Sequence, residues 1–308
     1  MPKAADTIGR VEQPEATAAL EHWHESKPRF TVLVYNMLGV WAQAEDVVAA
    51  VGEQVFKLEP GQAASVQNWP AFLTTLTTRR SIDVLRSAQH QRTDYVGSWL
   101  PEPIDQQMLP EEAAINDSML RLGILLLLEE LSPQARAAYV LHHALGYSAA
   151  DIAPVLESSP AAVRQMLSRA AKKLEQARTA QHDVSSVSSV LTEIVQAIHR
   201  ADTEGVIKLL AHDAVLYSDG GGKVRAARNP VVGAQRIARF MIGIERKNPG
   251  RQISTGRVNG EPALRFAIEG REDVLVIDVV SGSVQQILQV SNPDKLGLVG
   301  ANWDALAT

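Results

Sequence analysis

Hydrophobic spacing divides the chain into stretches with different periods. Apolar side chains recur every three or four positions over residues 15–92 and again over residues 111–178, which predicts amphipathic helices. Between them, Tyr95–Pro110 contains three prolines and one glycine, too many breakers for a helix, and predicts a linker. Glu59–Pro70 predicts a loop within the first helical stretch, and the polar run Gln181–Ser189 marks the next boundary.

The last third of the chain has another pattern. Apolar residues from Leu191 to Ile198 follow helical spacing, and Thr203–Leu210 fits a second short helix. A strand is expected at Ala214–Tyr217, and Asn259-Gly260 favours a tight hairpin turn between two later strands. The expected fold is therefore α+β, with helices first and an antiparallel sheet after them. Its later strands are expected at Gln252–Val258, Ala263–Glu269, Val274–Val280 and Val284–Val290.

Length and composition indicate a globular protein with two or three domains. A chain of 308 residues is too long for one ordinary core, and 45% hydrophobic and 21% charged residues are typical values. The longest strongly apolar stretch, Leu122–Leu128, is too short to cross a membrane, and Met1–Arg10 lacks an export-signal pattern. We therefore expect a cytoplasmic protein with no membrane partner. Without cysteine there can be no disulfide, thiolate metal site or cysteine nucleophile, and no pattern predicts a metal or cofactor.

Basic charge gathers in two short windows of an acidic chain. The net charge is −5, whereas a protein that binds duplex DNA unaided usually has a basic face. Arg79–Arg92 holds four arginines against one aspartate, and Arg164–Arg178 holds five cations against one glutamate. Any role on DNA must therefore depend on these local patches or on a partner.

The second window belongs to a helix-turn-helix pattern. Ser132 and Pro133 begin a helix that Gly146 ends. Ser148 and Asp151 form a capping pair at the start of a short second helix, in which Pro154 is expected to cause a kink. A third helix is expected from Pro160 to about Ala177.

The polar face of this third helix is a candidate DNA-binding surface. An isolated amphipathic helix with these side chains would more simply be a solvated basic surface. The short helix and tight turn before it favour a recognition helix, with early polar groups for base edges and later lysines for phosphates. The residues are Arg164, Gln165, Ser168, Arg169, Lys172 and Lys173.

The first window has two interpretations that spacing alone does not separate. Arg79, Asp83, Arg86 and His90 follow one another at steps of four, three and four, so they share one helix stripe. The arginines can simply pair with Asp83, or their surplus charge can meet nucleic acid.

Several stretches resemble one family. LVYNMLGVWAQAEDVVAAV (Leu33–Val51) is similar to regions 2.1–2.2 of bacterial sigma factors, and the segment Asn68–Arg92 resembles regions 2.3–2.4. EELSPQARAAYVLHHALGYSAADIAPVLESSPAAVRQMLSRAAKKL (Glu129–Leu174) looks like region 4. Three shorter motifs narrow the resemblance to group 41, the sigma-J-like extracytoplasmic-function (ECF) factors of the sigma-70 family. They are YVGSWLPEP (Tyr95–Pro103), DGGGK (Asp219–Lys223) and NPDKL (Asn292–Leu296).

The resemblance implies a fold and domain bounds. It implies two all-α sigma domains and a C-terminal SnoaL-like domain of the NTF2-like fold. Region 2 would span residues 15–94, the linker 95–112, region 4 113–180 and the C-terminal domain 186–304. The implied function is promoter-specific transcription initiation with core RNA polymerase, and the protein is not expected to be an enzyme.

The resemblance also implies partners and site residues. The partners are promoter DNA and core RNA polymerase, through its β′ clamp and β flap. Region 4 would read the −35 element with the polar face described above. Clamp binding is implied for Glu45, Asp46, Val47 and Val48, although Ala49 and Ala50 replace the usual Gln-Glu pair, which predicts weaker docking. Binding of the −10 element is implied for Asn68, Arg79, Arg80, Arg86, His90 and Arg92. The basic tail of this region is diluted by Gln89, His90 and Gln91.

The three short motifs support a hypothesis about regulation. We expect the DGGGK and NPDKL segments to pack near the proline-stiffened linker and to set the spacing of regions 2 and 4 within one chain. The residues concerned are Trp99, Leu100, Pro101, Glu102, Pro103, Asp219, Gly220, Gly221, Gly222, Lys223, Asn292, Pro293, Asp294 and Lys295.

Two other functions stay open at this point. One is a helix-turn-helix regulator with a ligand-sensing domain, which would bind DNA alone; a small ligand in the NTF2-like cavity is a candidate partner in either case. The other is a SnoaL-like enzyme with a degenerate sigma portion, using His212, Asp213, Asp219 or Asp278 in acid–base chemistry. Local hydrogen bonding at turns explains the first two residues more simply.

Overall fold

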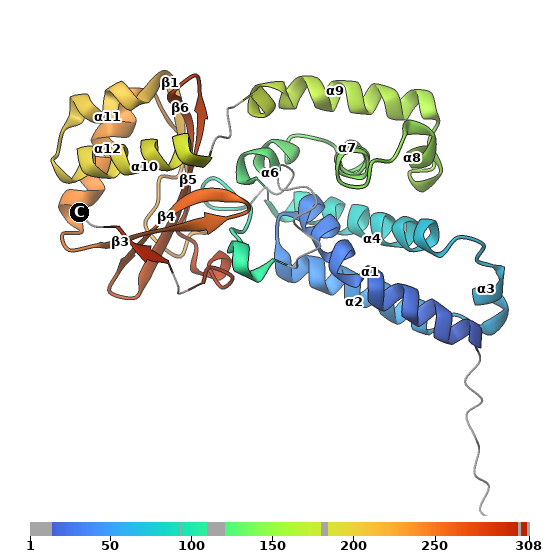
Figure 1. The fold of residues 1–308 in the computed structure, drawn as a ribbon. Helices are drawn as coiled ribbons and strands as arrows, with labels where there is room; N and C mark the ends of the chain where they lie inside the picture. Colours follow the sequence, from blue (N-terminus) through green and yellow to red (C-terminus); the bar gives the residue numbers. More distant parts are fainter. Residues whose placement is uncertain (1–13, 93, 110–120, 180–183, 301–302, 307–308) are drawn as a thin grey trace, which may run out of the picture.

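The computed structural model describes residues 14–92, 94–109, 121–179, 184–300 and 303–306. It consists of two helical domains that lie against each other and an α+β domain beside both (Figure 1). The linker runs through the place where the three meet. No helix in these described ranges is long and apolar enough to cross a membrane.

The first domain is a bundle of helices. Gly39, with a φ of +72°, separates the first two helices, and Pro28 lies within the first without ending it. The segment predicted as a loop, Glu59–Pro70, contains a short helix that begins with Pro60 and a Glu59–Gln62 capping box, so that prediction was wrong in part. The helices are α1 (Pro14–Leu38), α2 (Trp41–Phe56), α3 (Pro60–Ser65) and α4 (Trp69–Arg92).

The second domain contains the predicted helix-turn-helix. The Ser132 hydroxyl accepts a hydrogen bond from the Ala135 amide, Gly146 ends the helix with a φ of +70°, and Ser148 and Asp151 form the capping box. Pro154 lies in the last turn of its helix, which ends one residue later. The helices are α6 (Leu122–Leu128), α7 (Pro133–Leu145), α8 (Ala149–Val155) and α9 (Pro160–Thr179).

These two domains share one hydrophobic core. Buried side chains of α1 and α2, such as Leu38 and Val48, belong to the same cluster as Tyr139 of α7 and Val163 of α9. Helices α1 and α4 both pack against α7. The two helical domains are therefore closed on each other in this structure rather than separated by the linker.

The α+β domain has a seven-stranded sheet with the order β2-β1-β6-β5-β4-β3-β7. Two expectations were wrong: the sheet is mixed, because β1 and β6 are parallel, and a helix lies between the second and third strands. This helix, α12 (Ala234–Lys247), buries Ile237, Ala238 and Met241 on one side, a stripe that helical spacing could have revealed. The Asn259-Gly260 hairpin turn is confirmed, with both residues at positive φ.

The remaining elements of this domain are α10 (Val184–His199), α11 (Thr203–Leu209), β1 (Leu210–Asp219), β2 (Val231–Val232), β3 (Gln252–Val258), β4 (Glu261–Ile268), β5 (Arg271–Val280), β6 (Ser283–Val290) and β7 (Asp304–Ala305). Two 3₁₀ turns, η1 (Gln106–Met108) and η3 (Pro293–Lys295), lie in the linker and after β6.

The sheet is covered on both faces. Helices α10, α11 and α12 contribute to one apolar cluster with buried side chains such as Ile277 of β5. A separate cluster joins Val276 and Leu288 of the sheet to Leu100 of the linker and Leu122 of α6. The second face of the sheet therefore holds the linker and the start of the second domain.

Arg121 fixes this contact. Its side chain is 6% exposed and lies within 2.8 Å of Glu261 and 2.9 Å of Asp278, both on the sheet. Burial raises the pKa of the Glu261 and Asp278 carboxyl groups, and the positive charge of Arg121 opposes this rise. The sequence pattern gave no indication of this three-residue cluster.

Replacing Arg121 should destabilise the protein far more than replacing an exposed arginine. Arg121→Met leaves two buried carboxylates without their cation, and breaking such a pair costs about 3–5 kcal/mol. Arg86→Met, which removes an exposed 3.4 Å pair with Asp83, should cost between zero and about 1 kcal/mol. Denaturant unfolding followed by tryptophan fluorescence compares them; equal midpoints for the two variants would contradict the assignment.

Candidate functional site

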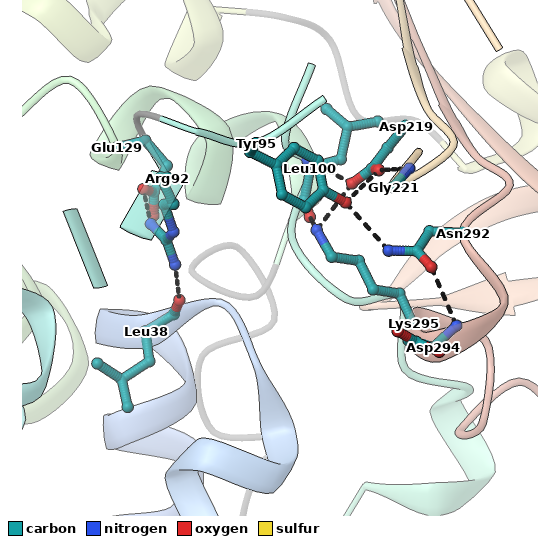
Figure 2. Close-up of polar contacts among 10 residues, drawn as sticks. All are labelled: Leu38, Arg92, Tyr95, Leu100, Glu129, Asp219, Gly221, Asn292, Asp294 and Lys295. Atoms are coloured by element: carbon teal, nitrogen blue, oxygen red, sulfur yellow. Dashed lines mark hydrogen bonds and ion pairs between the residues drawn. The ribbon is translucent and has the colours of Figure 1, made fainter. Parts of the chain in front are cut away.

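A buried carboxylate at the end of β1 holds the linker. The Oδ1 atom of Asp219 accepts hydrogen bonds from the Tyr95 hydroxyl at 2.5 Å and the Gly221 amide at 3.0 Å (Figure 2). Its Oδ2 atom accepts from the Leu100 amide at 2.9 Å and from Lys295 Nζ at 2.7 Å. Asp219 has no solvent-exposed surface. All four donors are thus directed at one carboxylate.

Lys295 completes this arrangement from η3. Its ammonium also donates to the Leu100 carbonyl at 2.5 Å and lies 4.2 Å from the centroid of the Trp99 ring. Burial lowers the pKa of Lys295 to about 8, although Asp219 favours the charged form. We call Tyr95, Leu100, Asp219, Asn292 and Lys295 the linker clamp.

The glycines of the DGGGK motif permit the clamp's close contacts. Gly221 has a φ of +58°, and a Cβ atom there would lie 2.3 Å from the amide nitrogen of Asn292. That amide nitrogen donates to the Tyr95 hydroxyl at 3.0 Å. A Cβ atom on Gly220 would lie 2.7 Å from Ala226. Lys223 and Asp294 form an ion pair, but both are more than half exposed and lie outside the buried part.

The linker also contacts the first domain. Glu102 accepts a hydrogen bond from the Trp41 amide at 2.7 Å through its side chain, and its backbone carbonyl accepts from the Tyr35 hydroxyl at 2.6 Å. The Asn259 side chain donates to the Tyr35 hydroxyl at 2.7 Å and accepts from the Ile104 amide at 2.9 Å. Sequence analysis missed Tyr35 and Trp41, and assigned Asn259 only to a turn.

The prolines and Trp99 of the WLPEP motif lie in the same contact. Pro101 and Pro103 are buried. A Cβ atom on Gly39 would lie 2.7 Å from the Trp99 ring, so the glycine between α1 and α2 makes room for the linker. Pro293 begins η3 and so places Asp294 and Lys295.

Arg92 is held within the protein in this arrangement. It forms an ion pair with Glu129 and donates to the Leu38 carbonyl at 2.9 Å (Figure 2). It also lies 3.6 Å from the Trp99 ring centroid. Glu129 also pairs with the buried Arg136. Burial, with Arg136 as the second cause, lowers the pKa of Arg92 to about 9. This cluster joins α4 to the second domain, so here Arg92 does not present its guanidinium to DNA.

Arg79 likewise bridges the two helical domains. Its guanidinium donates to the carbonyls of Val155 at 3.2 Å and Pro154 at 3.3 Å, and lies 3.0 Å from the Glu157 carboxylate. These groups end helix α8 of the helix-turn-helix. Arg79 therefore donates to two carbonyls at the C-terminal end of helix α8.

The other residues expected at the −10 element have mixed surroundings. Asn68 accepts a hydrogen bond from the Ala71 amide at the start of α4, Arg80 is exposed, and Arg86 is exposed beside Asp83. The side chain of His90 lies outside the described residues. Arg80 and Arg86 thus lie exposed on α4, and Asn68 directly precedes the first residue of that helix.

Helix α2 presents only part of the expected polymerase-binding set. Glu45 and Asp46 are exposed, as is Ala49. Val47 and Val48 are 3% and 0% exposed and belong to the core, so direct binding of a partner by these two valines is corrected to a packing role. The exposed carboxylates are the groups of this set that can reach a protein partner.

The recognition-helix candidates lie on the outer face of α9. Val163, Ala170 and Leu174 are fully buried, which fixes the helix orientation. Lys173 lies 3.2 Å from Glu130 in an exposed pair. The remaining candidates, Arg164, Gln165, Ser168, Arg169 and Lys172, are exposed.

The acid–base candidates do not come together. His212 and Asp213 are exposed on β1, Asp219 is enclosed in the linker clamp, and Asp278 pairs with Arg121. Within the described residues, no group of three or more His, Asp or Glu side chains is placed to hold a metal ion. In the described part of the chain, these four candidates form contacts between domains and no acid–base pair with one another.

Comparisons with known proteins match this organisation. The family model for sigma-70 region 4 matches residues 121–174. The chain is 31% identical over 285 residues to the ECF RNA polymerase sigma factor SigJ of Mycobacterium tuberculosis, covering 85% of this chain and 88% of that protein. It is 24% identical to the probable ECF sigma factor SigI of the same species, covering 89% of this chain and 93% of that protein. The crystal structure of M. tuberculosis SigJ superposes with a TM-score of 0.70 at 27% identity, covering 92% of this chain and 98% of that one.

Substitution of Asp219 should release the linker, whereas substitution of Lys223 should not. Asp219→Asn removes the charge that compensates buried Lys295 and weakens the acceptor for the Leu100 amide. Hydrogen exchange of the Leu100, Glu102 and Ile104 amides should therefore accelerate at least about tenfold. Lys223→Ala removes only an exposed pair and serves as the matched control. Hydrogen exchange with mass spectrometry measures both; unchanged protection in Asp219→Asn would refute the role of the clamp.

Proposed function

This chain belongs to the ECF sigma factor family, and on that premise we propose that it binds core RNA polymerase and directs transcription from particular promoters, with its C-terminal domain controlling this activity from within the chain. The linker clamp is the observation that carries the regulatory part. It connects the C-terminal domain directly to the segment between regions 2 and 4.

The proposed contacts with DNA and polymerase follow the exposed polar faces. Helix α9 binds the −35 element through Arg164, Gln165, Ser168, Arg169 and Lys172, with Lys173 released from Glu130. Helix α4 binds the −10 element. Glu45 and Asp46 bind the β′ clamp, and region 4 meets the β flap. Because the chain is acidic overall, the core enzyme would supply much of the electrostatic attraction to DNA.

The closed arrangement is proposed to be the form before promoter binding. The −35 and −10 elements are about 25 base pairs apart, which is roughly 85 Å of straight duplex at 3.4 Å per base pair. In the structure, Arg79 of the −10 helix touches the helix-turn-helix itself. Regions 2 and 4 must therefore separate before both elements can be bound, and Arg79 and Arg92 become available to DNA only then.

The C-terminal domain is proposed to hold the linker in place during this closed state. It contacts the linker through the linker clamp and through Asn259, and it contacts the start of region 4 through Arg121. Opening regions 2 and 4 requires the linker to change its path. The strength of these buried contacts then sets how readily the free chain opens.

The charged face of α9 should determine promoter output. Arg164→Ala with Arg169→Ala should reduce transcription by core enzyme at a responsive promoter about tenfold or more, because two phosphate or base contacts are lost. Lys208→Ala, which removes an exposed cation from α11 of the C-terminal domain, is the control. In vitro transcription compares them; full activity of the double variant would exclude α9 as the DNA-binding helix.

Locking the closed state should stop initiation reversibly. Asp83 lies one helical turn from Arg79, whose guanidinium contacts Glu157, so cysteines at positions 83 and 157 can be joined by a disulfide-containing bismaleimide. No other thiol competes, because the sequence has no cysteine. The joined Asp83→Cys, Glu157→Cys chain should give less than about a tenth of the transcripts of the same protein after reductive cleavage.

The cleaved protein is the control, since it carries the same two substitutions and the same spacer remnants. Equal transcription before and after cleavage would show that regions 2 and 4 need not separate. Deleting the whole C-terminal domain is a poorer test, because it uncovers the buried Leu100 and Leu122 and leaves Arg121 without its carboxylates.

A further inference from the structure

A cavity lies in the C-terminal domain beside the loop Arg225–Ala227, which follows the DGGGK motif in the sequence. Its volume is about 520 Å³, which is the size of a site for a small organic molecule. Its walls come from one side of α12, from the loop Arg225–Ala227, and from the adjoining ends of β4, β5 and β6. It does not overlap the linker clamp or the proposed DNA-binding faces.

Positive charge dominates the rim of this cavity. Arg225, Arg239, Lys247 and Arg271 line it, and in the described part of the chain none of the four has an ion pair. The one acidic side chain in the lining is Asp273. It lies 3.9 Å from Arg251, so its charge is offset by a fifth cation. Arg251 also pairs with Glu245 outside the lining, so five cations and two carboxylates leave a surplus of three positive charges.

Arg251 supplies a buried donor. Its side chain is 7% exposed, pairs with Glu245 at 2.9 Å and lies 4.2 Å from the Phe266 ring centroid. Its Nε–H has no hydrogen-bond partner among the described residues although it is buried. Arg251 is thus a lining cation of the cavity whose position is fixed by Glu245.

Part of the remaining lining is apolar, beside the amide side chains of Asn248 and Gln289. Phe240, Ile244 and Ile268 form part of the wall, so an apolar body fits beside the charged groups. Gly243 lies in the middle of α12 and also lines the cavity, and a Cβ atom there would meet nothing within 4 Å. A glycine in a helix interior costs stability, so here it keeps space open rather than favouring the helix.

We propose that this cavity binds a small organic anion, with a carboxylate or phosphate head held by Arg251 and the rim cations and an apolar body against Phe240, Ile244 and Ile268. This goes beyond the proposed sigma function and does not depend on it. The basic rim selects a negative charge, and the apolar wall selects against inorganic anions.

The position of the cavity gives such a ligand a route to the linker. Ala226 is both part of the cavity wall and the residue against which Gly220 packs, at 2.7 Å from where a Cβ atom would lie. Gly220 follows Asp219 of the linker clamp directly. A smaller cavity lined by Val96, Gly97 and Ala226 lies between this loop and the linker. A ligand that moves the loop Arg225–Ala227 would therefore act on the clamp.

Calorimetric titration of the full chain tests the proposal with four probes: octyl phosphate, octanoate, inorganic phosphate and 1-octanol. Octyl phosphate and octanoate should each bind at one site. The ratio of their affinities shows whether the site prefers a phosphate or a carboxylate head. Inorganic phosphate and 1-octanol should each bind at least about tenfold more weakly, because each lacks one half of the recognised chemistry. Affinity for the anions should fall as salt increases.

Matched variants locate the site. Gly243→Leu fills the cavity and should abolish binding, whereas Gly243→Ala gives the same gain in helix propensity with little added volume and should retain most of it. Arg239→Gln with Arg271→Gln should weaken binding about tenfold, while Arg236→Gln, an exposed residue of α12 outside the lining, should leave it unchanged.

Three results would overturn the proposal: no saturable binding of either amphiphilic anion up to millimolar concentration, equal affinity for 1-octanol, or unchanged affinity in both the Gly243→Leu and the Arg239→Gln, Arg271→Gln proteins. The charge variants change exposed side chains only, so they keep the test decisive if the larger side chain at position 243 impairs folding.

Discussion

The position of the linker between the three domains depends on the buried ion pair of Asp219 and Lys295. Removing two charges from water is costly, and the cost is offset only when geometry and hydrogen bonding are nearly complete. Here the carboxylate accepts from four donors, and the ammonium has both Asp219 and the Leu100 carbonyl within 2.7 Å. Three of these groups belong to the linker: the Tyr95 hydroxyl, the Leu100 amide and the Leu100 carbonyl. If the linker leaves, a buried charge pair loses its surroundings, so the position of the linker is strongly specified.

The linker therefore acts as a shared component of three domains rather than as a flexible connection. On one side Glu102 and Tyr35 attach it to region 2, and on the other Asn259 attaches it to the sheet of the C-terminal domain. Arg92 extends the same contact to region 4 by pairing with Glu129 while stacking on Trp99. Regions 2 and 4 consequently share one core, and groups expected to meet DNA are used internally. Under the proposed function, binding of polymerase and promoter competes with these contacts.

Sequence alone predicted the elements whose signals are local. The caps at Ser132 and Ser148, the end at Gly146 and the Asn259-Gly260 turn all follow from side chains within a few residues. The α+β class and the motifs that join the linker to the C-terminal domain were also accessible. The parallel pairing of β1 with β6 was not, because it brings together strands about 70 residues apart in sequence. Arg121, Tyr35 and the internal contacts of Arg79 and Arg92 were missed because their partners are also distant in the sequence. The residues around an arginine do not indicate whether its side chain will contact a carboxylate, a carbonyl or a phosphate.

The most direct test of the closed state measures the separation of regions 2 and 4 in solution. Donor and acceptor dyes on cysteines introduced at exposed positions 83 and 157 report this separation by energy transfer, in the chain alone and after addition of core RNA polymerase. The account predicts one high-transfer population for the free chain, a shift to low transfer on the polymerase, and a partial shift in the free chain when Asp219 is replaced by Asn. A free chain that already shows low transfer, or a polymerase complex that keeps high transfer, would contradict it.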